Sequence, residues 1–528
     1  MRCGAHVALL TMLLGGGVCP RSAAQGFNMR HNMFGWVQNS NGFSVEQNQA
    51  GEFIAFSNNP YVDTTSNLYW PSIAGSVRVS STGQFLGQDT VFDPQKATYV
   101  GWSNCATRLP DGRMVVSGGT QNADTNWAAL YWFDQNGLLL DHEEYLVNSR
   151  SWIAYQHKNT PDGGFIVGGV ASVNGQQDIL WFKTDSLGNL EWWHTYGHPT
   201  RPDWIINVDL APGGGYYMSG VYRVTAQNKA HWVLRVDSAG SVVWERFPGT
   251  PVSHNYDVLD AYLTTLADGG LVVASGEWSG FIQNTWPQLV KLDTAGTVVW
   301  DKRYGVDKFA SGFYVVQEVV PHGDLIACGL RSFDDGNGGA YWLGTLLRTT
   351  NEGDSLWMYD YMYYDSLMTD GGSKFRDVQP TPDGGFIGVG DAGGSISGNN
   401  PPGLSGDVWV VKVDSMGCLV PGCDDFSTAI TVQATNLRDA LSVYPNPAHG
   451  STTVKVTLPS RAPLLGRGAG GEGDLRLRLV SAQGQEVLVQ KAALGENQVT
   501  LRGLAAGVCY LHLTSGSTWL GGAKLIIE

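Results

Sequence analysis

Runs of apolar and small residues alternate with short glycine turns along most of this chain, and the alternation has a long period. The turns that open the runs are QAGE at Gln49, PDGR at Pro110, PDGG at Pro161, PGGG at Pro212, ADGG at Ala267, PHGD at Pro321 and PDGG at Pro382. Successive turns lie 61, 51, 51, 55, 54 and 61 residues apart. A period near 50 residues indicates an array of similar supersecondary units.

One unit, read from its opening turn TPDGG at Thr160, predicts four strands. Three short stretches rich in β-forming residues follow the turn, at 165–169, 178–183 and 189–195, and 203–209 precedes the next turn. Tight turns join the strands, because an aspartate side chain bonds backbone amides two residues on and glycine accepts positive φ. Seven four-stranded units predict an all-β fold, a seven-bladed β-propeller. A solenoid is the alternative, although its repeats are usually shorter.

A second turn recurs inside the units, and we interpret its aspartates as structural. Five copies run from an aspartate to a glycine three residues later, beginning at Asp134, Asp185, Asp237, Asp293 and Asp414. Weaker versions without the aspartate end at Gly83 and Gly353. Near-equivalent copies at one turn position are typical of turn chemistry and remove these carboxylates from the catalytic candidates.

A tryptophan stands four residues beyond that glycine in four units, at Trp192, Trp244, Trp300 and Trp357. A large ring that recurs at one position of each sheet predicts packing against the neighbouring sheet. The last unit lacks this tryptophan, because only residues 418–420 precede Pro421. We therefore predict that the segment around Met33–Val37 pairs onto the last sheet and closes the ring, with Trp36 in place of the missing tryptophan.

Composition supports a folded β protein and excludes some partners. The 528 residues are 43% hydrophobic and 15% charged, with 69 glycines, 19 tryptophans and 21 tyrosines, which suits short strands and tight turns and argues against disorder. The formal net charge of −15 argues against nucleic acid and anionic lipid as partners, since both need basic patches.

The first 24 residues are predicted to be a secretory signal peptide. Arg2 gives the positive start, residues 8–18 are apolar, and Ser22-Ala23-Ala24 offers a small-residue cleavage site. Val18 precedes Cys19 where a lipidated cysteine normally follows a small residue, so we favour cleavage after Ala24. No stretch approaches the ~18 apolar residues that a membrane helix needs, so no transmembrane segment is predicted.

Cysteine usage fits an oxidising compartment. Cys418 and Cys423 flank a turn at Pro421-Gly422 and are predicted to form a disulfide. Cys105 and Cys328 are interpreted as small buried hydrophobes. No cysteine or histidine cluster has zinc spacing. The DDGNG sequence at 334–338 offers oxygen ligands for calcium but lacks EF-hand spacing, so we interpret it as a polar loop and predict no cofactor.

The repeat pattern ends after Phe426, which sets the propeller at 25–426 and a linker at 427–440. Alternating runs such as 453–458 and 475–480 predict strands of a small β-sandwich over 441–528. The Pro/Gly-rich stretch 460–473 is predicted to be a loop inserted between them.

Several residues of this tail resemble a known family. Tyr444-Pro445-Asn446-Pro447, the turn at Gly484, the strand at Gly507 and the ending from Lys524 to Ile527 together resemble the type A C-terminal sorting domain of the type IX (Por) secretion system. Cys509 departs from the family, which usually has tyrosine there, and the Pro/Gly-rich insertion is unusual. The repeats resemble those of secreted propellers that carry such domains.

The resemblance implies a destination and partners. Such proteins cross the outer membrane of a Gram-negative bacterium through the type IX machinery, and a sorting peptidase removes the domain. The mature protein is released or is attached to surface lipopolysaccharide. These implications follow from the resemblance and concern export alone.

The residues outside the repeated turns mark no catalytic site. The remaining acidic candidates are Asp141, Glu143, Glu144, Asp257, Asp260, Glu277, Asp334, Asp335, Asp360 and Asp365, and no pair among them is distinguished by context. His194 and His198 lie at a strand end, without the helical geometry of a zinc site. Neither a nucleophile elbow nor a phosphate-binding loop occurs.

Two functions remain open. The favoured one is a secreted or cell-surface propeller without catalysis, which binds an extracellular polysaccharide or protein. The alternative is a secreted polysaccharide hydrolase or lyase with its site on the loop face. Carboxylates or histidines that converge at one end of the ring would favour the enzyme, and an aromatic groove without them would favour binding. Specificity is predicted to lie in the long loops at 58–70, 220–230, 332–339 and 390–406.

Overall fold

The computed structural model describes most of the chain from residue 26 onward. The described residues are 26–528 without 34–39, 64–67, 149–150, 174, 199, 225–227, 249–251, 254–260, 279–283, 307, 310, 335–339, 364–371, 394–405, 421–434, 437–439, 458–474, 483–485 and 516–517. All of their regular elements are β-strands. Trp36, Cys423, Gly484 and most of the DDGNG sequence lie outside this part of the chain.

Seven sheets account for the described strands between residues 27 and 436. The first contains β2 (Asn41–Gln47), β3 (Phe53–Asp63), β4 (Leu68–Val79) and β5 (Phe85–Val91). The second contains β6 (Ala97–Val100), β7 (Ala106–Arg108), β8 (Met114–Gln121), β9 (Asn126–Phe133) and β10 (Leu139–Tyr145). The third contains β11 (Trp152–Asn159), β12 (Phe165–Val173), β13 (Gln176–Thr184) and β14 (Leu190–Tyr196).

The other four sheets repeat this plan. The fourth contains β15 (Trp204–Leu210), β16 (Tyr216–Arg223), β17 (Asn228–Val236), β18 (Val242–Arg246) and the short β19 (Val252–Ser253). The fifth contains β20 (Tyr262–Thr265), β21 (Leu271–Trp278), β22 (Asn284–Leu292), β23 (Val298–Arg303) and β24 (Lys308–Phe309). The sixth contains β25 (Gly312–Val319), β26 (Asp324–Asp334), β27 (Ala340–Thr349), β28 (Ser355–Tyr361) and β32 (Thr435–Asn436). The seventh contains β29 (Ser373–Pro380), β30 (Phe386–Ala392), β31 (Asp407–Val413) and β1 (Phe27–His31).

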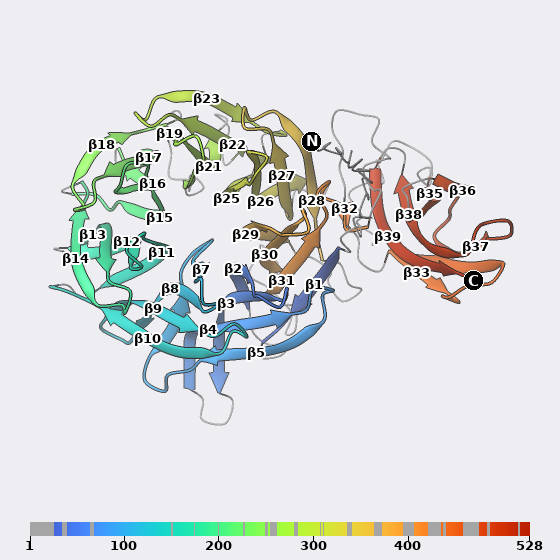
Figure 1. Ribbon diagram of the computed structural model, residues 1–528, viewed down its shortest axis with the longest axis horizontal. Coiled ribbons are helices and arrows are strands. Elements are labelled where there is room, and N and C mark those ends of the chain that lie inside the picture. The colour runs from blue at the N-terminus through green and yellow to red at the C-terminus, as the bar shows by residue number, and fades with distance from the viewer. Residues whose placement is uncertain are drawn as a thin grey trace, which may run out of the picture.

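The seven sheets follow one another around a ring (Figure 1). Strands such as β2, β11, β15 and β29 lie nearest its centre, and β5, β10, β14 and β18 lie at its rim. Within each sheet the neighbouring main strands are consecutive in the chain and antiparallel, apart from the seventh, which β1 completes. The predicted order of turn and strand within each unit is therefore confirmed.

The repeated aspartates are turn residues, as predicted. Asp185 is representative: one of its carboxylate oxygens accepts hydrogen bonds from the backbone N–H groups of Leu187 and Asn189, both at 2.8 Å. The turns at Asp134, Asp237, Asp293 and Asp414 have the same pair of bonds. Hydrogen bonding to the carboxylate lowers the pKa of Asp185, with its side-chain bond from Asn189 as the largest cause.

Each of these second turns ends in a glycine that touches the preceding sheet around the ring. The seven glycines all have positive φ, and they are Gly83, Gly137, Gly188, Gly240, Gly296, Gly353 and Gly417. An added Cβ would meet an aromatic ring of the preceding sheet at six of them, whereas Gly137 meets Ile54 and Ser76. We call this packing the turn-glycine contact. Glycine is needed at this position for two reasons: the backbone has a positive φ, and a Cβ would collide with the neighbouring sheet.

The four repeated tryptophans all make turn-glycine contacts. Trp192 lies against Gly240, Trp244 against Gly296, Trp300 against Gly353 and Trp357 against Gly417. The indole N–H groups of Trp300 and Trp357 also donate to backbone oxygens of the next turn, those of Asn351 and Ser415, at 3.1 Å each. Each of the four rings therefore packs between two neighbouring sheets, and two of them also form a hydrogen bond with the next sheet.

A second set of contacts joins the innermost strands. Asp377 accepts a hydrogen bond from the backbone N–H of Val45 at 3.0 Å across the junction of the seventh and first sheets. Side chains at the matching position of other strands do the same: Ser44 accepts from Ala106, Gln156 from Val208 and Asn207 from Leu263. Because each acceptor side chain is buried, these bonds fix the register between neighbouring sheets.

The N-terminal segment closes the ring, but with a strand slightly earlier than predicted. β1 pairs antiparallel with β31, from Phe27 opposite Lys412 to His31 opposite Val408. Phe27 packs against the turn glycine of the first sheet, Gly83, while Trp36 lies outside the described residues and its predicted role stays a prediction. The pairing strand thus lies before the predicted segment Met33–Val37, of which residues 34–37 lie outside the described part of the chain. Met33 instead enters the core between the first and seventh sheets.

The C-terminal residues form two further sheets beside the ring (Figure 1). One contains β33 (Leu441–Tyr444), β34 (Ser451–Val456) and β37 (Gly495–Thr500). The other contains β36 (Glu486–Lys491), β35 (Leu475–Ser481), β38 (Gly507–Ser515) and β39 (Thr518–Ile527). Apolar residues of both sheets share one core, and Trp519 of β39 belongs instead to the core of the sixth and seventh sheets of the ring.

The turn-glycine contact predicts unequal costs for two glycines of equal φ. Gly240 has a φ of 85° and an added Cβ would lie 2.8 Å from Trp192 Cζ3, whereas Gly384 has a φ of 84° and nothing within 4 Å. Gly384→Ala should cost about 1–2 kcal/mol for its left-handed backbone alone. Gly240→Ala should cost roughly 1–3 kcal/mol more for overpacking. Thermal and denaturant unfolding of both variants measure the difference, and equal losses would contradict the contact.

Ring closure by β1 predicts that a short truncation destabilises the whole ring. A chain that begins at Asn32 lacks β1 and leaves β31 with an unpaired edge. We expect its thermal midpoint to fall by several degrees relative to a chain that begins at Gln25, which retains β1. A midpoint that does not change would show that β1 contributes nothing to closure.

Candidate functional site

β-Bulges in the innermost strands bring one residue of several sheets to the centre of the ring. The register shifts place Phe43, Tyr155, Ile206, Tyr314 and Arg376 at the bulges of the first, third, fourth, sixth and seventh sheets. A bulge leaves its extra residue unpaired and bends the strand, so the side chain is redirected. In the second sheet the interruption is longer, since β6 ends at Val100 and β7 begins at Ala106.

A cation–aromatic cluster shows that these residues meet on the ring axis. The guanidinium carbon of Arg376 lies 4.5 Å from the ring centre of Phe43 and 5.9 Å from those of Trp102 and Tyr314. Trp102 belongs to the second sheet and Tyr314 to the sixth, which are not neighbours around the ring. Contact of one guanidinium with both is therefore contact across the centre.

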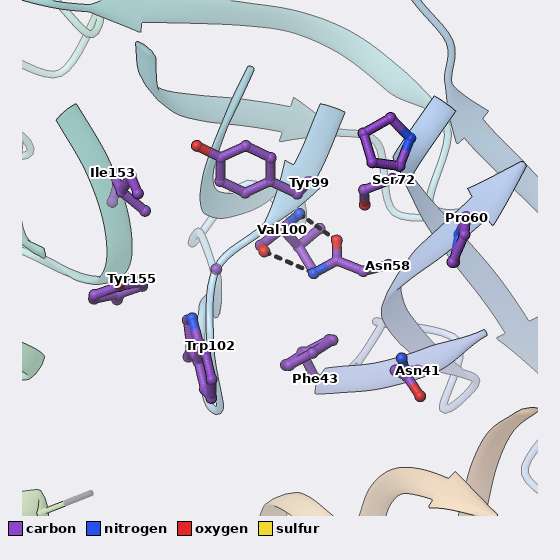
Figure 2. Close-up of a pocket in the computed structure, with 13 residues that line it drawn as sticks. Asn41, Phe43, Asn58, Pro60, Ser72, Tyr99, Val100, Trp102, Ile153 and Tyr155 are labelled. Carbon is purple, nitrogen blue, oxygen red and sulfur yellow. Dashed lines mark hydrogen bonds between the residues drawn. The ribbon is translucent and has the colours of Figure 1, made fainter. Parts of the chain in front are cut away.

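A pocket of about 360 Å³ lies beside this cluster, between the first three sheets (Figure 2). Four of its 13 lining residues are the aromatic side chains Phe43, Tyr99, Trp102 and Tyr155. The others are Asn41, Asn58, Pro60, Pro71, Ser72, Val100, Gly101, Ile153 and Ala154. A concave site with mostly apolar walls and a few polar groups is the usual form of a small-ligand site.

The interruption in the second sheet builds one wall of the pocket. Asn58 fixes the end of β6, where the interruption begins. The side-chain amide of Asn58 donates to Val100 O at 3.1 Å and accepts from Val100 N at 2.7 Å, as Figure 2 shows. Trp102 N donates to Tyr155 O at 3.0 Å. Gly101 is required between them, because any Cβ there would collide with the Tyr155 carbonyl. The chain thereby turns the Trp102 ring towards the pocket, with 39% of that residue exposed.

The aromatic walls meet nearly at right angles. Trp102 lies edge-on to Tyr155, with ring centres 5.9 Å apart and an interplanar angle of 87°. Phe43 and Trp102 are related in the same way, at 6.3 Å and 71°. Edge-to-face pairs are a favourable arrangement of aromatic quadrupoles, so these rings hold one another in position without a ligand.

Two polar atoms of the pocket wall are buried and make no hydrogen bond within the described part of the protein. They are the hydroxyls of Tyr99 and Ser72. Burial is also the main cause that raises the pKa of Tyr99, followed by the neighbouring Tyr155. A buried hydroxyl without a partner is costly, and such groups are rare in native proteins. These two hydroxyls are the unpaired polar atoms of the described pocket wall.

The pocket wall has no strongly ionisable side chain. Among the described residues that line it there is no aspartate, glutamate, histidine, lysine, arginine or cysteine. Arg376, next to Phe43, donates from its Nε to Asp391 at 3.0 Å, and Asp391 also pairs with Lys374 at 3.4 Å. The site is thus aromatic and amide-lined, without an acid or base to transfer protons.

Two carboxyl groups with raised pKa values lie in the inner strands but outside the pocket wall. Burial raises the pKa of Asp377 to about 6, although it accepts bonds from Ser44 Oγ and from the backbone N–H groups of Val45 and Val378. Burial, and then the charge of Asp377, raises the pKa of Glu46 to about 8. Asp377 is engaged in the junction between sheets, so its structural role accounts for it.

The predicted long loops are found at one end of the sheets, where they are mainly extensions of hairpins. Residues 58–70 run along β3 and β4, and they supply Asn58 and Pro60 to the pocket. The loops at 220–230, 332–339 and 390–406 join the same pair of strands in other sheets, and parts of each lie outside the described residues. One of the four therefore contributes to the candidate site.

The acidic and histidine candidates do not gather at this site. Asp360 is buried in an ion pair with Arg331, and Glu144 pairs with Lys96 at 2.6 Å. Asp141 and Glu143 lie on the rim strand β10, and His194 on the rim strand β14 packs between Trp181 and Trp192. Asp257, Asp260, Asp335 and Asp365 lie outside the described residues. Within the described residues no group of three or more histidine, cysteine or acidic side chains has a metal-binding arrangement.

The sequence motif of the tail forms a connected structure. Asn446 donates from its amide to Lys524 O at 2.7 Å and accepts from Ile526 N at 2.9 Å. Tyr444 donates to Glu496 at 2.6 Å, and Gly507 pairs with Ile527 across β38 and β39. Residues nearly 80 positions apart are thus clamped together, with the backbone of Pro445 bonded to Thr452.

Cys418 is disulfide-bonded, while Cys105, Cys328 and Cys509 are free and buried. Cys423 lies outside the described residues, so its pairing with Cys418 stays a prediction. Burial raises the pKa of all three free thiols, which makes them poor nucleophiles.

No helix among the described residues is long and apolar enough to cross a membrane.

The sequence did not point to the residues of the pocket, although it held one signal. The first two opening turns lie 61 residues apart where the next two steps are 51. Part of the extra length is the stretch GWSNC at 101–105, which interrupts the innermost strand of the second sheet. An insertion in the strand nearest the centre, rather than in a loop, is what places Trp102 in the site.

Residues 442–528 match a family model described as "Secretion system C-terminal sorting domain". The C-terminal part of this chain is a sorting domain of the type IX (Por) secretion system, in agreement with the YPNP sequence and its clamp to the last strand. Such a tail indicates that the protein is secreted or lies at the cell surface.

No curated protein matches the sequence. Among solved structures, the chain is similar to a protein of unknown function from Dyadobacter fermentans, with a TM-score of 0.40, 11% identity and coverage of 74% of this chain and 98% of that one. It is similar to PorZ of the type IX secretion system of Porphyromonas gingivalis, with a TM-score of 0.33, 12% identity and coverage of 90% and 69%. It is also similar to an α-L-arabinofuranosidase of Fusarium graminearum, with a TM-score of 0.39, 10% identity and coverage of 62% and 98%. At these values no activity is carried across.

The raised pKa of Glu46 predicts a loss of stability as the pH rises. The folded protein keeps a proton on Glu46 up to about pH 8, whereas the unfolded chain releases it near the ordinary value of 4.5. The folded state therefore binds more protons between these values, and its stability falls over that window. Glu46→Gln should flatten the fall. The change in thermal midpoint between about pH 5 and about pH 8, measured for both proteins, tests this prediction. An equal change in the two proteins would contradict the assignment.

Proposed function

We propose that this protein is a secreted or cell-surface binding protein without catalytic activity. Residues 25–426 would form a seven-bladed β-propeller whose ligand enters the aromatic pocket beside the ring axis. The seven sheets around one centre, and closure by an N-terminal strand, support this fold. Residues 1–24 would be the signal peptide, 427–440 the linker and 441–528 a β-sandwich sorting domain.

The observation that carries the proposal is the composition of the pocket wall. Four aromatic side chains, two asparagines and a serine supply contact area and hydrogen bonds, as binding sites require. A glycosidase needs two carboxyl groups on either side of the scissile bond, one as an acid and one as a base or nucleophile. The described lining contains neither. This favours binding of an extracellular polysaccharide or protein over the alternative, a polysaccharide hydrolase or lyase.

The sorting domain supports the proposed location. Its family membership implies export through the type IX machinery, and a sorting peptidase is the second expected partner. The mature ring would then stand at the outer surface of a Gram-negative bacterium. The protein is acidic, with a pI near 5.1, and has no excess of basic residues for binding nucleic acid.

The proposal predicts binding that depends on Trp102. A chain that begins at Gln25 should bind at least one member of a panel of immobilised polysaccharides, a mucin and a collagen, measured by biolayer interferometry. Trp102→Ala should weaken that binding by roughly tenfold or more, because it removes a central aromatic contact.

Phe247→Ala is the matched control, since this aromatic residue of the fourth sheet is also exposed (42%) and lies outside the pocket. It should leave binding unchanged. Binding that Trp102→Ala does not affect would place the ligand elsewhere. Release of reducing ends or unsaturated products from any of the polysaccharides would overturn the proposal in favour of the enzyme.

A further inference from the structure

We propose that the pocket recognises a neutral sugar unit, which lies against the Trp102 ring and forms hydrogen bonds with the hydroxyls of Tyr99 and Ser72. This inference rests on the proposed binding function and names the chemical class of its ligand. Three features of the pocket carry it: two unsatisfied hydroxyls, the aromatic walls and a described lining without charged side chains.

The first feature is the pair of buried hydroxyls. Tyr99 Oη and Ser72 Oγ are shielded from solvent and have no hydrogen-bond partner in the described protein. Each costs the free protein an unmade hydrogen bond. The Tyr99 hydroxyl lies over Gly119 of β8, where an added Cβ would come within 2.4 Å of it, and Figure 2 shows it on the side of the pocket where Ile153 lies.

A ligand hydroxyl satisfies such groups best, since it both donates and accepts a hydrogen bond. Tyr99 Oη and Ser72 Oγ have the same dual capacity. A polyhydroxylated ligand therefore pairs with both, whatever the direction of each proton, and Asn41 at the pocket edge adds an amide that donates and accepts.

The second feature is the shape of the walls. A pyranose or furanose ring has an apolar face of C–H groups and a polar edge of hydroxyls, so it needs a flat aromatic wall and hydrogen-bonding groups at its side. The Trp102 ring is the exposed aromatic surface, and Tyr155 stands across it at 87°. Large, rigid aromatic side chains with few rotatable bonds supply this contact at little entropic cost.

The third feature is neutrality. A carboxylate or sulfate on the sugar would lose its hydration in the pocket and needs a cation in exchange. Arg376 is the cation that borders the pocket, and its guanidinium is bonded to Asp391, covered by Phe43 and only 12% exposed at the side chain. Asp391 also pairs with Lys374, so the guanidinium is engaged and covered rather than free to bind an anionic ligand, and the described lining itself has no charged side chain. The pocket therefore favours an uncharged ligand.

The test uses calorimetric titration of the chain that begins at Gln25 with xylo-, manno- and cello-oligosaccharides, and with oligogalacturonate as the charged counterpart. At least one neutral oligosaccharide should bind, and oligogalacturonate should bind more than tenfold weaker or not at all. Trp102→Ala should abolish the neutral binding.

Tyr99→Phe gives the sharper readout, because it should move affinity and stability in different directions. Loss of one hydrogen bond should weaken sugar binding by about threefold to tenfold. The thermal midpoint should stay the same or rise, because the variant removes an unsatisfied buried hydroxyl. Tyr131→Phe is the matched control: its hydroxyl already donates to Gly119 O at 2.6 Å, so this variant should lose stability and keep its affinity.

The outcomes separate this inference from the proposed function. Preference for oligogalacturonate, or a Tyr99→Phe variant with unchanged affinity, overturns the neutral-sugar assignment while binding at the pocket stands. A protein ligand whose binding requires Trp102 does the same. Failure of every polysaccharide and protein to bind in a Trp102-dependent manner overturns the binding function itself, and the sugar assignment with it.

Discussion

The ring depends on one repeated contact, in which a side chain of one sheet packs onto the positive-φ glycine of the next sheet's second turn. All seven junctions have it, with an aromatic ring at six of them. The glycine supplies a backbone conformation that other residues resist, and its bare Cα lets the neighbouring ring approach. Because the same contact recurs at each step, the sheets keep similar spacing around the centre. Closure follows the same rule, since Phe27 on β1 packs against Gly83 and joins the last sheet to the first.

The candidate site lies where the innermost strands depart from the repeated arrangement of the sheets. The innermost strands are joined by buried side-chain bonds such as that from Val45 N to Asp377, which hold the bulged residues at fixed heights around the axis. Within that arrangement the second sheet breaks its innermost strand into β6 and β7, and the break turns Trp102 towards the first and third sheets. The pocket is thus a local departure from a repeated scaffold. Three of its four aromatic rings, those of Phe43, Trp102 and Tyr155, contact one another edge-on, and a backbone bond joins Trp102 to Tyr155.

Much of the frame could be predicted from the sequence, since turns and repeats are local. The glycine and aspartate spacing predicted the number of units, the order of strands and the role of the repeated tryptophans. The closing strand was placed a few residues too late, because alternation in FNMRH is weaker than the apolar run that follows. The pocket could not be predicted. Tyr99, Trp102 and Tyr155 come from two sheets that meet only after the ring forms, and a single tryptophan in GWSNC has no local feature that separates it from a core residue. The sorting domain was recognised because its signature is contiguous, although the clamp between Asn446 and the last strand required the structure.

The central claim is that the interrupted strand of the second sheet creates a site for a neutral sugar. A crystal structure of the chain that begins at Gln25, grown with a neutral oligosaccharide that it binds, tests this most directly. The account predicts a sugar ring in contact with the Trp102 face, with one hydroxyl within hydrogen-bonding distance of Tyr99 Oη and another near Ser72 Oγ. A sugar bound elsewhere on the ring, with the pocket empty and the Tyr99 hydroxyl unpaired, would contradict it.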